Sequence, residues 1–219
     1  FEAPADANGD NEYNITVTST DSLNTTTQEI TVTVTDINDT APVFTSADAF
    51  SVAEGTDAVA TLTGSDTEGD SVSFSTTLAG TDAADFTLSS SGALAFASTP
   101  NFEAAADAGA NNVYNITASI TDGTNTTTQA ITITVTDIND NSPVLTVATP
   151  YSVAEGTDAV GTVTTTDADA GTTITYTLSG TDAAKFDISA SGAITFAAAP
   201  DFETPGSAAN SNAYSLNVV

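Results

Sequence analysis

The chain has 219 residues, a formal net charge of −28, and neither cysteine nor histidine. Its one basic residue, Lys185, cannot neutralise a nucleic-acid backbone, and no apolar run is long enough to span a bilayer. The lack of cysteine excludes disulfides, thiolate catalysis and zinc–thiolate sites. Hydrophobic residues make up 40% of the chain, so an ordered fold is expected despite the charge.

The predicted elements are strands. Residues 30–35 alternate apolar and polar side chains, which is typical of an antiparallel strand with one face in a core. Residues 131–136 repeat this pattern, residues 114–120 form the preceding strand, and Asp122-Gly123-Thr124-Asn125 is the predicted turn between them. About seven short strands in about 100 residues, without helical periodicity, predict an all-β chain of immunoglobulin-like β-sandwiches.

The chain repeats itself with a period of about 101 residues. Residues 51–59 recur at 152–160, residues 80–86 recur at 180–186, and Phe-Glu pairs stand at 1–2, 102–103 and 202–203. This register predicts the C-terminal part of one repeat over 1–39, a complete repeat over 40–140, and the truncated N-terminal part of a third over 141–219. We expect a window from a longer array; neighbouring chains that complete the cut repeats are the alternative.

Carboxylates recur at fixed positions of the repeat, and most strongly where one repeat meets the next. The linkers read Asp36-Ile37-Asn38-Asp39 and Asp137-Ile138-Asn139-Asp140. Two like charges about 5 Å apart repel by roughly 3 kcal/mol at an effective dielectric constant near 20, so such clusters favour a bound divalent cation. Calcium suits six to eight oxygen ligands better than magnesium. Adaptation of the surface to salty water is the alternative explanation of the acidity.

These motifs in this order resemble cadherin-type repeats over essentially the whole chain. The similar elements are a Glu at the end of the first strand, a D-x-E loop, a D-x-D loop, a late-strand Asp and a D-x-N-D-N-x-P linker. The Thr- and Ala-rich repeats look more like those of large bacterial surface adhesins than like animal cadherins. The resemblance implies tandem Greek-key β-sandwiches with two or three calcium ions at each linker.

The resemblance also implies ligands, position by position. At the first junction they are Glu2, Asp36, Asn38, Asp39, Asp66, Glu68 and Asp122, with the carbonyls of Ile37 and Thr40. At the second junction they are Glu54, Asn101, Glu103, Asp137, Asn139, Asp140, Asp167 and Asp169, with the carbonyls of Ile138 and Asn141. A third junction would use Glu155, Asp201 and Glu203. Asn101 stands where the family has Asp, so the outermost ion at the second junction is expected to bind weakly.

The function that follows is that of an extender: a calcium-rigidified segment of a cell-surface adhesin or extracellular filament, with adjacent repeats and lateral or end-to-end copies as its partners. The expected location is the bacterial cell surface. The alternative is homophilic cell–cell adhesion through the repeats themselves. An enzyme is not expected, because glycoside hydrolysis, the reaction best suited to paired acids, requires a sugar-binding cleft that small tandem sandwiches do not offer.

Overall fold

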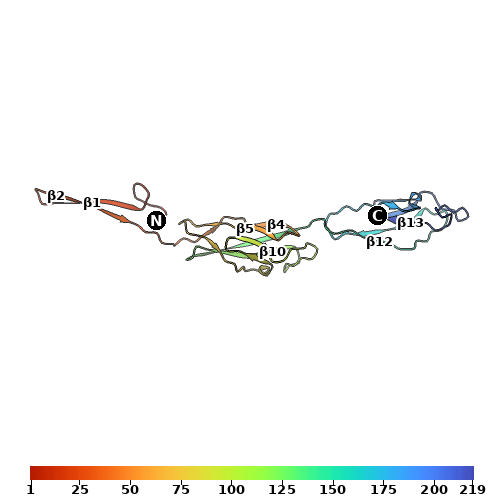
Figure 1. The fold of residues 1–219 in the computed structure, drawn as a ribbon, viewed down its shortest axis with the longest axis horizontal. Coiled ribbons are helices and arrows are strands. Elements are labelled where there is room, and N and C mark those ends of the chain that lie inside the picture. The colour runs from red at the N-terminus through yellow and green to blue at the C-terminus, as the bar shows by residue number, and fades with distance from the viewer. The chain divides into compact units, whose positions relative to one another are not determined.

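The computed structural model describes all 219 residues, and its regular elements are strands apart from two single-turn 3-10 helices (Figure 1). These turns are η1 (Ala83–Asp85) and η2 (Ala183–Lys185), and neither has the length or apolar character needed to cross a membrane. The chain forms two compact units, Phe1–Thr136 and Asp137–Val219, and each is described by itself.

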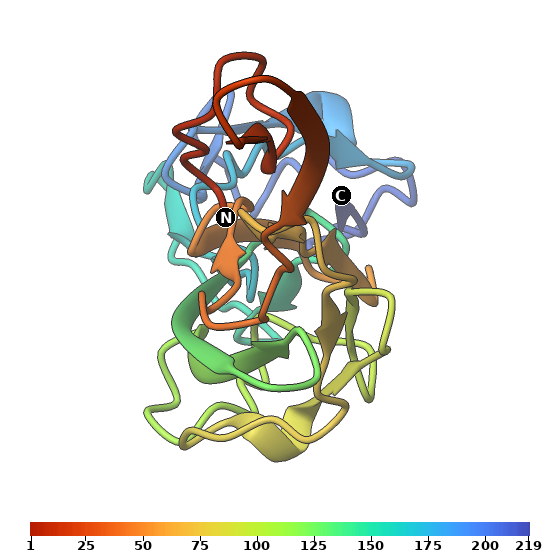
Figure 2. The ribbon, with the colours of Figure 1, turned by 90° about the vertical axis from the view of Figure 1, so that its left-hand side faces the viewer.

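The first unit begins with a long hairpin, coloured red to orange in Figure 2, in which β1 (Glu12–Thr20) pairs antiparallel with β2 (Thr25–Thr33). The turn between the strands is held by Asp21, whose Oδ1 accepts the backbone N–H groups of Leu23 at 3.1 Å and Asn24 at 2.8 Å. The strand predicted over residues 30–35 is the end of β2, although the regular ladder stops at Thr33.

Residues 40–140, which we call the middle repeat, form two facing sheets. One sheet has the order β4-β11-β10-β7 and the other the order β5-β9-β8, with β3–β6 as a short additional ladder. The strands of the first sheet are β4 (Ala49–Ala53), β7 (Ser73–Phe74), β10 (Val113–Thr121) and β11 (Thr126–Thr136). The others are β3 (Val43–Phe44), β5 (Ala58–Thr61), β6 (Gly64–Ser65), β8 (Phe86–Leu88) and β9 (Ala93–Phe96). Strand β11 is central, since it pairs antiparallel with β10 and parallel with β4.

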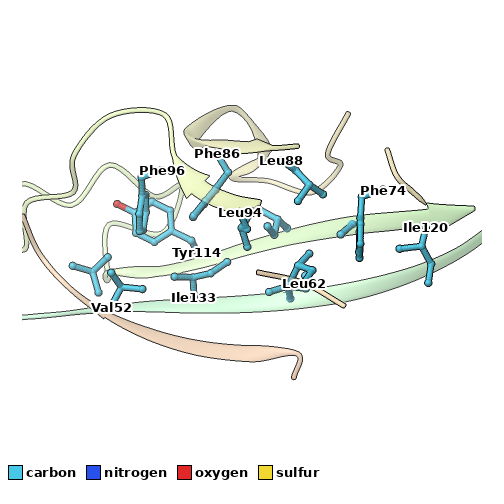
Figure 3. Close-up of a cluster of buried hydrophobic side chains, with 14 residues drawn as sticks. Val52, Leu62, Phe74, Phe86, Leu88, Leu94, Phe96, Tyr114, Ile120 and Ile133 are labelled. Carbon is cyan, nitrogen blue, oxygen red and sulfur yellow. The ribbon is translucent and has the colours of Figure 1, made fainter. Parts of the chain in front are cut away.

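The core of the middle repeat lies between these sheets (Figure 3) and contains 14 buried hydrophobic residues. The alternation in β10 and β11 places Ile116, Ile131 and Ile133 inside, each at most 2% exposed. Phe86 and Phe96 lie with ring centroids 4.5 Å apart. Tyr114 meets both rings edge-on, at 5.5 Å and 5.3 Å. The predicted strands over 114–120 and 131–136 are confirmed, and the three rings form part of the core.

A buried carboxylate fixes the long loop of the middle repeat. Asp82, only 3% exposed, accepts the backbone N–H of Ala108 at 2.8 Å and of Asn115 at 2.7 Å. One repeat later, Asp182 accepts the N–H groups of Ala208 at 2.7 Å and Ser215 at 2.8 Å. These two recurring acids are therefore backbone caps, as their turn-like context predicts.

The recurring Ser-Gly-Ala motif also has a structural cause. Gly92 has φ +90° and Gly192 has φ +77°, a region that other residues rarely adopt. A Cβ at either position would collide with a backbone carbonyl, that of Leu62 at the first glycine and that of Val163 at the second. The motif therefore marks the close approach of a turn to the neighbouring strand.

The second unit has no strand longer than four residues, whereas the middle repeat has β10 with nine and β11 with 11. The strands of the second unit are β12 (Val144–Thr146), β13 (Ala159–Thr162), β14 (Thr164–Thr166), β15 (Leu178–Ser179), β16 (Phe186–Ile188), β17 (Ala193–Phe196) and β18 (Asn217–Val218). The sheet β13-β17-β16 repeats β5-β9-β8, and the Phe186–Phe196–Tyr214 rings repeat the aromatic cluster. Residues 150–154, which correspond to β4, do not form a strand. Only Val163, Phe186 and Ile194 form its buried core.

Candidate metal centre

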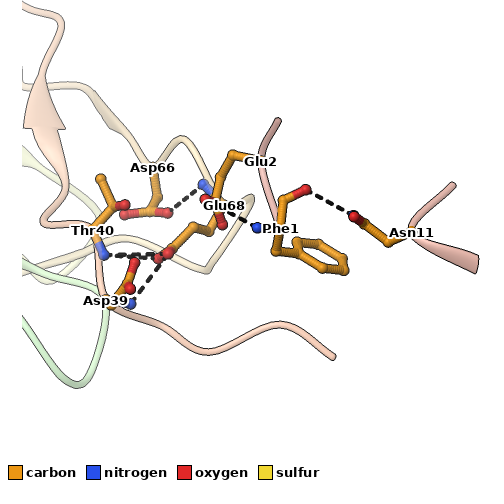
Figure 4. A network of polar contacts seen from close by, with 7 residues as sticks. All are labelled: Phe1, Glu2, Asn11, Asp39, Thr40, Asp66 and Glu68. Atoms are coloured by element: carbon orange, nitrogen blue, oxygen red, sulfur yellow. Dashed lines mark hydrogen bonds and ion pairs between the residues drawn. The ribbon is translucent and has the colours of Figure 1, made fainter. Parts of the chain in front are cut away.

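The first linker is tied to the loop that follows β6. The Glu68 carboxylate accepts the backbone N–H of Asp39 at 3.1 Å through Oε1, and that of Thr40 through Oε1 at 3.2 Å and Oε2 at 3.1 Å (Figure 4). The loop is itself closed by Asp66, whose Oδ1 accepts the N–H of Glu68 at 2.8 Å. The linker and the Asp66–Glu68 loop, which occupies the D-x-D position of the repeat with Glu68 in place of the second Asp, thus form one structure although 28–29 residues separate the bonded groups.

The turn between β10 and β11 reaches the same linker. Asp122 Oδ1 accepts the N–H groups of Thr124 at 2.7 Å and Asn125 at 2.6 Å, which shapes the turn. The Asn125 amide then donates to Asn38 Oδ1 at 2.8 Å and to the Thr40 carbonyl at 3.1 Å. Three of the predicted ligand residues, Asp122, Asn38 and Thr40, therefore meet through Asn125.

Asn125 was not among the predicted site residues. A signal for it exists in the sequence, since Asp21 and Asn24 stand at the equivalent places of the first hairpin. The structure also shows that the Asn38 oxygen and the Thr40 carbonyl, both predicted as calcium ligands, accept hydrogen bonds from this amide.

Carboxylate oxygens converge in two overlapping groups at this end of the middle repeat. Glu2, Asp36 and Glu68 can place oxygen atoms within 4.8 Å of one another, and so can Asp66, Glu68 and Asp70. Glu2 also lies 3.6 Å from the amino group of Phe1. Asp70 was missed in the sequence, where its position, four residues after Asp66, was the available signal.

One oxygen in this cluster lacks a hydrogen-bonding partner. Asp66 Oδ2 is buried and accepts no hydrogen bond, although a buried anionic oxygen normally requires a donor or a cation. Calcium binds oxygen at about 2.3–2.6 Å, so two ligands of one ion can lie up to about 5 Å apart. The carboxylate spacing and this unpartnered oxygen both fit a hard divalent cation.

The electrostatics of the linker reflect its crowded carboxylates. A hydrogen bond with the Glu68 carboxyl raises the pKa of Asp39, and desolvation and the charges of Glu68 and Glu2 raise it further. Desolvation opposes ionisation of Glu68 as well, yet the N–H groups of Asp39 and Thr40 hold the pKa of Glu68 below its ordinary value. Desolvation, followed by the charges of neighbouring acids such as Asp66, raises the pKa of Asp70. A cation would relieve the repulsion that favours these protons.

The predicted ligands of the second junction fall in both units. In the first unit, Glu54 is 3% exposed and its Oε2 accepts the N–H of Phe102 at 2.7 Å. Asn101 Oδ1 accepts the N–H of Ala104 at 2.9 Å and so caps a turn. Glu103 follows Phe102 and is exposed. The hydrogen bond from Phe102 therefore fixes the backbone that carries Glu103.

In the second unit, the D-I-N-D linker is tied to the D-x-D loop. Asp169 Oδ2 accepts the N–H of Asn141 at 2.9 Å, and its Oδ1 accepts the Asn141 side-chain amide at 2.7 Å. Asp167 Oδ1 accepts the N–H of Asp169 at 3.1 Å, as Asp66 does for Glu68. The same Asn141 amide donates to Asp140 Oδ1 at 2.9 Å. The linker-to-loop attachment is thus built twice in the chain.

Asp137 completes this attachment from the linker side. Its Oδ2 accepts the N–H of Ala170, while its Oδ1 is buried and accepts no hydrogen bond. Ile138 and Asn139 are both exposed. A second unpartnered carboxylate oxygen therefore occurs beside the second linker, as Asp66 Oδ2 does beside the first.

A further acidic group lies within the second unit. Glu155, Asp201 and Glu203 can bring oxygen atoms within 4.8 Å of one another, as predicted for a third junction. Glu155 Oε2 accepts the N–H of Phe202 at 3.0 Å, which repeats the bond from Phe102 to Glu54. Asp201 Oδ1 accepts the N–H of Glu203 at 2.9 Å.

Comparison with solved structures identifies the fold. The chain is similar to human protocadherin-24 EC1-2 with a TM-score of 0.61 and 21% identity, over 75% of this chain and 80% of that one. It is similar to protocadherin gammaB7 EC3-6, in a cis-dimer structure, with a TM-score of 0.69 and 23% identity, over 87% of this chain and 52% of that one. It is similar to mouse cadherin-23 EC22-24 with a TM-score of 0.58 and 19% identity, over 88% and 65%.

These comparisons confirm the predicted all-β, cadherin-type sandwich fold. The chain spans about half the length of the gammaB7 structure that it matches. No protein-family model matches the sequence, and no curated protein matches it.

Proposed function

We propose that the chain is a calcium-stiffened extender segment of an extracellular adhesin or filament. The supporting observation is the linker-to-loop attachment, in which Glu68 holds the backbone of Asp39 and Thr40 beside a buried, unpartnered Asp66 oxygen. A cation bound there would connect the linker, the Asp66–Glu68 loop and Glu2 of the preceding segment. Two segments joined by a linker cannot rotate independently when residues from both segments bind the same ion.

The residues that would hold calcium at the first junction are Glu2, Asp36, Asp66, Glu68 and Asp70, with Asp39 close by. The ion would supply positive charge where six acids otherwise repel one another. Because the linker motif, the D-x-D loop and the Glu54 position recur, we propose the same role for the acids of the second junction. We propose two or three ions at each junction.

An extracellular setting fits this chemistry. Calcium sites of extracellular modules have dissociation constants of about 0.1–1 mM, which match the calcium concentration outside cells rather than inside them. The chain has no cysteine, so bound metal takes the place that disulfides hold in many secreted proteins. The Thr- and Ala-rich composition supports a bacterial surface protein as the parent. We assign the acidic residues to metal binding and to backbone capping rather than to catalysis.

The test is small-angle X-ray scattering of the chain in 2 mM EDTA and across a calcium titration to about 5 mM, well above the expected dissociation constant. Calcium is expected to narrow the distribution of maximum dimensions and to stiffen the particle. The matched control replaces Asp66, Glu68 and Asp70 by Asn, Gln and Asn, which removes three of the six acidic charges at the first junction and none at the second. Identical scattering with calcium and with chelator would refute the proposal.

Homophilic adhesion through the repeats is the second candidate, supported by the cis-dimer that one similar protein, protocadherin gammaB7, forms. Beads coated with the chain would aggregate in calcium if the repeats of facing surfaces bind one another. Beads that stay dispersed, together with calcium-dependent stiffening in solution, would leave the extender as the function.

A further inference from the structure

The side-chain amide of Asn125 lies among three oxygens that the sequence assigns to calcium at the first junction. Its Nδ2 is 2.8 Å from Asn38 Oδ1, 3.1 Å from the Thr40 carbonyl oxygen and 3.2 Å from Asp122 Oδ2. A primary amide has two N–H groups, so its two hydrogens serve three acceptors. The lone pairs that these oxygens direct at Asn125 are therefore already in use, and an ion that needs them must displace the amide.

Asp122 is satisfied in this arrangement without a metal. Its Oδ1 accepts the backbone N–H groups of Thr124 and Asn125, and its Oδ2 accepts the Asn125 side-chain amide. Desolvation opposes ionisation, yet hydrogen bonds from Asn125, Thr124 and the Asn38 side chain hold the pKa of Asp122 below its ordinary value of 3.8. A carboxylate that accepts several N–H groups is stable as an anion on its own.

The neighbouring loop differs in this respect. Asp66 Oδ2 is buried and accepts no hydrogen bond, and Asp66, Glu68 and Asp70 can bring carboxylate oxygens within 4.8 Å of one another. Asp122 belongs to no such group of converging acids. One side of the first junction therefore lacks positive charge, whereas the protein itself supplies N–H donors to the other side.

We propose that the Asn125 amide takes the place of a calcium ion at the first junction. The amide is a latch that attaches the linker to the β10–β11 turn whether or not calcium is present. Calcium then binds only on the side of Asp66 and Glu68, so this junction holds two ions rather than three. The assignment of those ions rests on the proposed function, whereas the latch itself does not.

The latch also places the hinge of the calcium-free chain. Residues 38–40 are held to the middle repeat from two loops, by the Asn125 amide and by the Glu68 carboxylate. Val34 still belongs to the hairpin, where its N–H donates to a loop carbonyl at 3.0 Å. Residues 35–37, between these two attachments, are exposed and lie in no strand. Without calcium the chain should therefore bend at residues 35–37 and not after Thr40.

The second linker has an amide of its own at a comparable place. Asn141 Nδ2 donates to Asp169 Oδ1 at 2.7 Å and to Asp140 Oδ1 at 2.9 Å. The equivalent residue of the first linker is Thr40, which has no side-chain amide. Each linker is thus held by one amide that bonds to predicted ligand oxygens, and Asn125 supplies it where the linker cannot.

Nuclear magnetic resonance of the isotope-labelled chain tests the latch directly, because Asn side-chain amides give their own signals. The Asn125 signals are identified by their absence in Asn125→Ala. In EDTA they should exchange with solvent at least about tenfold more slowly than those of Asn24. Asn24 stands at the equivalent place of the first hairpin, and its amide bonds only to Asp21, at 3.3 Å and 3.4 Å. Calcium at about 5 mM should leave the protection of Asn125 unchanged.

Variants supply the second readout. Asn125→Ala should accelerate backbone exchange of residues 38–40 in EDTA by at least about tenfold, and the matched control Asn24→Ala should not. Asn125→Asp replaces the donor by a carboxylate, so it should bind one more calcium ion per chain than the native protein in equilibrium dialysis. Thermal unfolding checks that the middle repeat remains folded in each variant.

The outcomes separate the latch from the proposed function. An Asn125 amide that exchanges as fast as that of Asn24 in EDTA would overturn the latch. Loss of its protection on addition of calcium, or equal numbers of ions bound by the native chain and Asn125→Asp, would overturn the replacement of an ion. Protection in EDTA together with identical scattering in calcium and chelator would refute the extender and support the latch.

Discussion

The middle repeat and the second unit carry nearly the same motifs, yet they differ in how much of the sandwich forms. The middle repeat has 14 buried hydrophobic residues, and the second unit has three. Both retain the aromatic cluster, the Asp82 or Asp182 cap and the glycine turn. In the middle repeat, β11 pairs with β4 on one side and with β10 on the other. The local motifs therefore form in both regions, whereas residues 150–154, equivalent to β4, form no strand.

The largest expected contrast between the two regions is in hydrogen exchange. Backbone amides of β4 should exchange at least about 1,000-fold more slowly than those of residues 150–154, because only β4 has a partner strand. Mass-spectrometric exchange at low protein concentration measures both segments in one experiment. Equal protection would show that residues 150–154 are paired in solution.

A matched pair of side-chain truncations tests how much burial in the core contributes to the free energy of unfolding. Ile133→Ala should lower the free energy of unfolding of the middle repeat by about 3 kcal/mol, since Ile133 is fully buried. Val32→Ala, one repeat earlier and 49% exposed, should change it by less than about 0.5 kcal/mol. Urea unfolding at low concentration is the measurement. A similar loss in both variants would contradict the difference in burial between Ile133 and Val32.

The two aspartate caps should behave alike in spite of their different surroundings. Asp82→Ala leaves the N–H groups of Ala108 and Asn115 without their acceptor and should cost about 2 kcal/mol. Asp182→Ala should destabilise the second unit in the same way, because its hydrogen bonds match. Thermal unfolding of both variants, with Asp57→Ala as a surface control, gives the comparison. If only one of the two substitutions lowers the unfolding temperature, the two capped loops differ in their contribution to stability.

The Asp82 cap also sets a pH dependence. Desolvation opposes its ionisation, but the N–H groups of Ala108 and Asn115 hold the pKa of Asp82 below its ordinary value of 3.8. A carboxyl with a lowered pKa in the folded state contributes stability above pH 3.8, and this is lost as the pH falls through the lower folded value. The native protein should therefore lose stability below about pH 4 more steeply than Asp82→Ala, as measured by acid titration of the unfolding midpoint.

The smallest expected effects compare the two linker-to-loop attachments. Glu68 and Asp169 both bind linker amides, the first with a longer side chain. Glu68→Gln and Asp169→Asn should each weaken calcium binding by about tenfold, or about 1.4 kcal/mol, at their own junction. Calorimetric titration with calcium measures this, with Glu29→Gln on β2 as the control. Unchanged affinity in both variants would remove these acids from the metal site.

Much of this architecture could be predicted from the sequence because it depends on local pattern. Two-residue alternation predicted β10 and β11, and the sequence Asp122-Gly123-Thr124-Asn125 predicted the turn between them. Residues 150–154 form no strand although Ser152, Val153 and Ala154 match β4; Pro150, which stands where β4 has Ala49, lacks the backbone N–H that a strand donates. A strand is stabilised by its neighbour, and the neighbour lies about 80 residues further along the repeat.

For the candidate site, too, the features that depend on local sequence could be predicted and the long-range contacts could not. The linker acids and the Glu68 and Asp169 loops were assigned by position in the repeat, and the structure ties each loop to its linker through backbone N–H groups. The position-by-position transfer missed Asn125 and Asp70. The contact of Asn125 spans 87 residues, and the crowding of Asp70 depends on charges from three loops. Such long-range contacts are set by the packing of the sandwich and not by the motif in which a residue stands.

The single-turn helix η2 ends at the one residue of the chain after which trypsin can cut. Lys185, at its end, is exposed and is the chain's one basic residue, so trypsin has a single possible cleavage point. The Lys185 N–H donates to the Asp182 carbonyl at 2.9 Å, and the Lys185 carbonyl accepts the Ala197 N–H at 2.8 Å. Because the backbone is held in these two hydrogen bonds, a protease can bind this peptide only after the turn opens. The rate of that one cut consequently reports how often this turn opens, without any label or engineered residue.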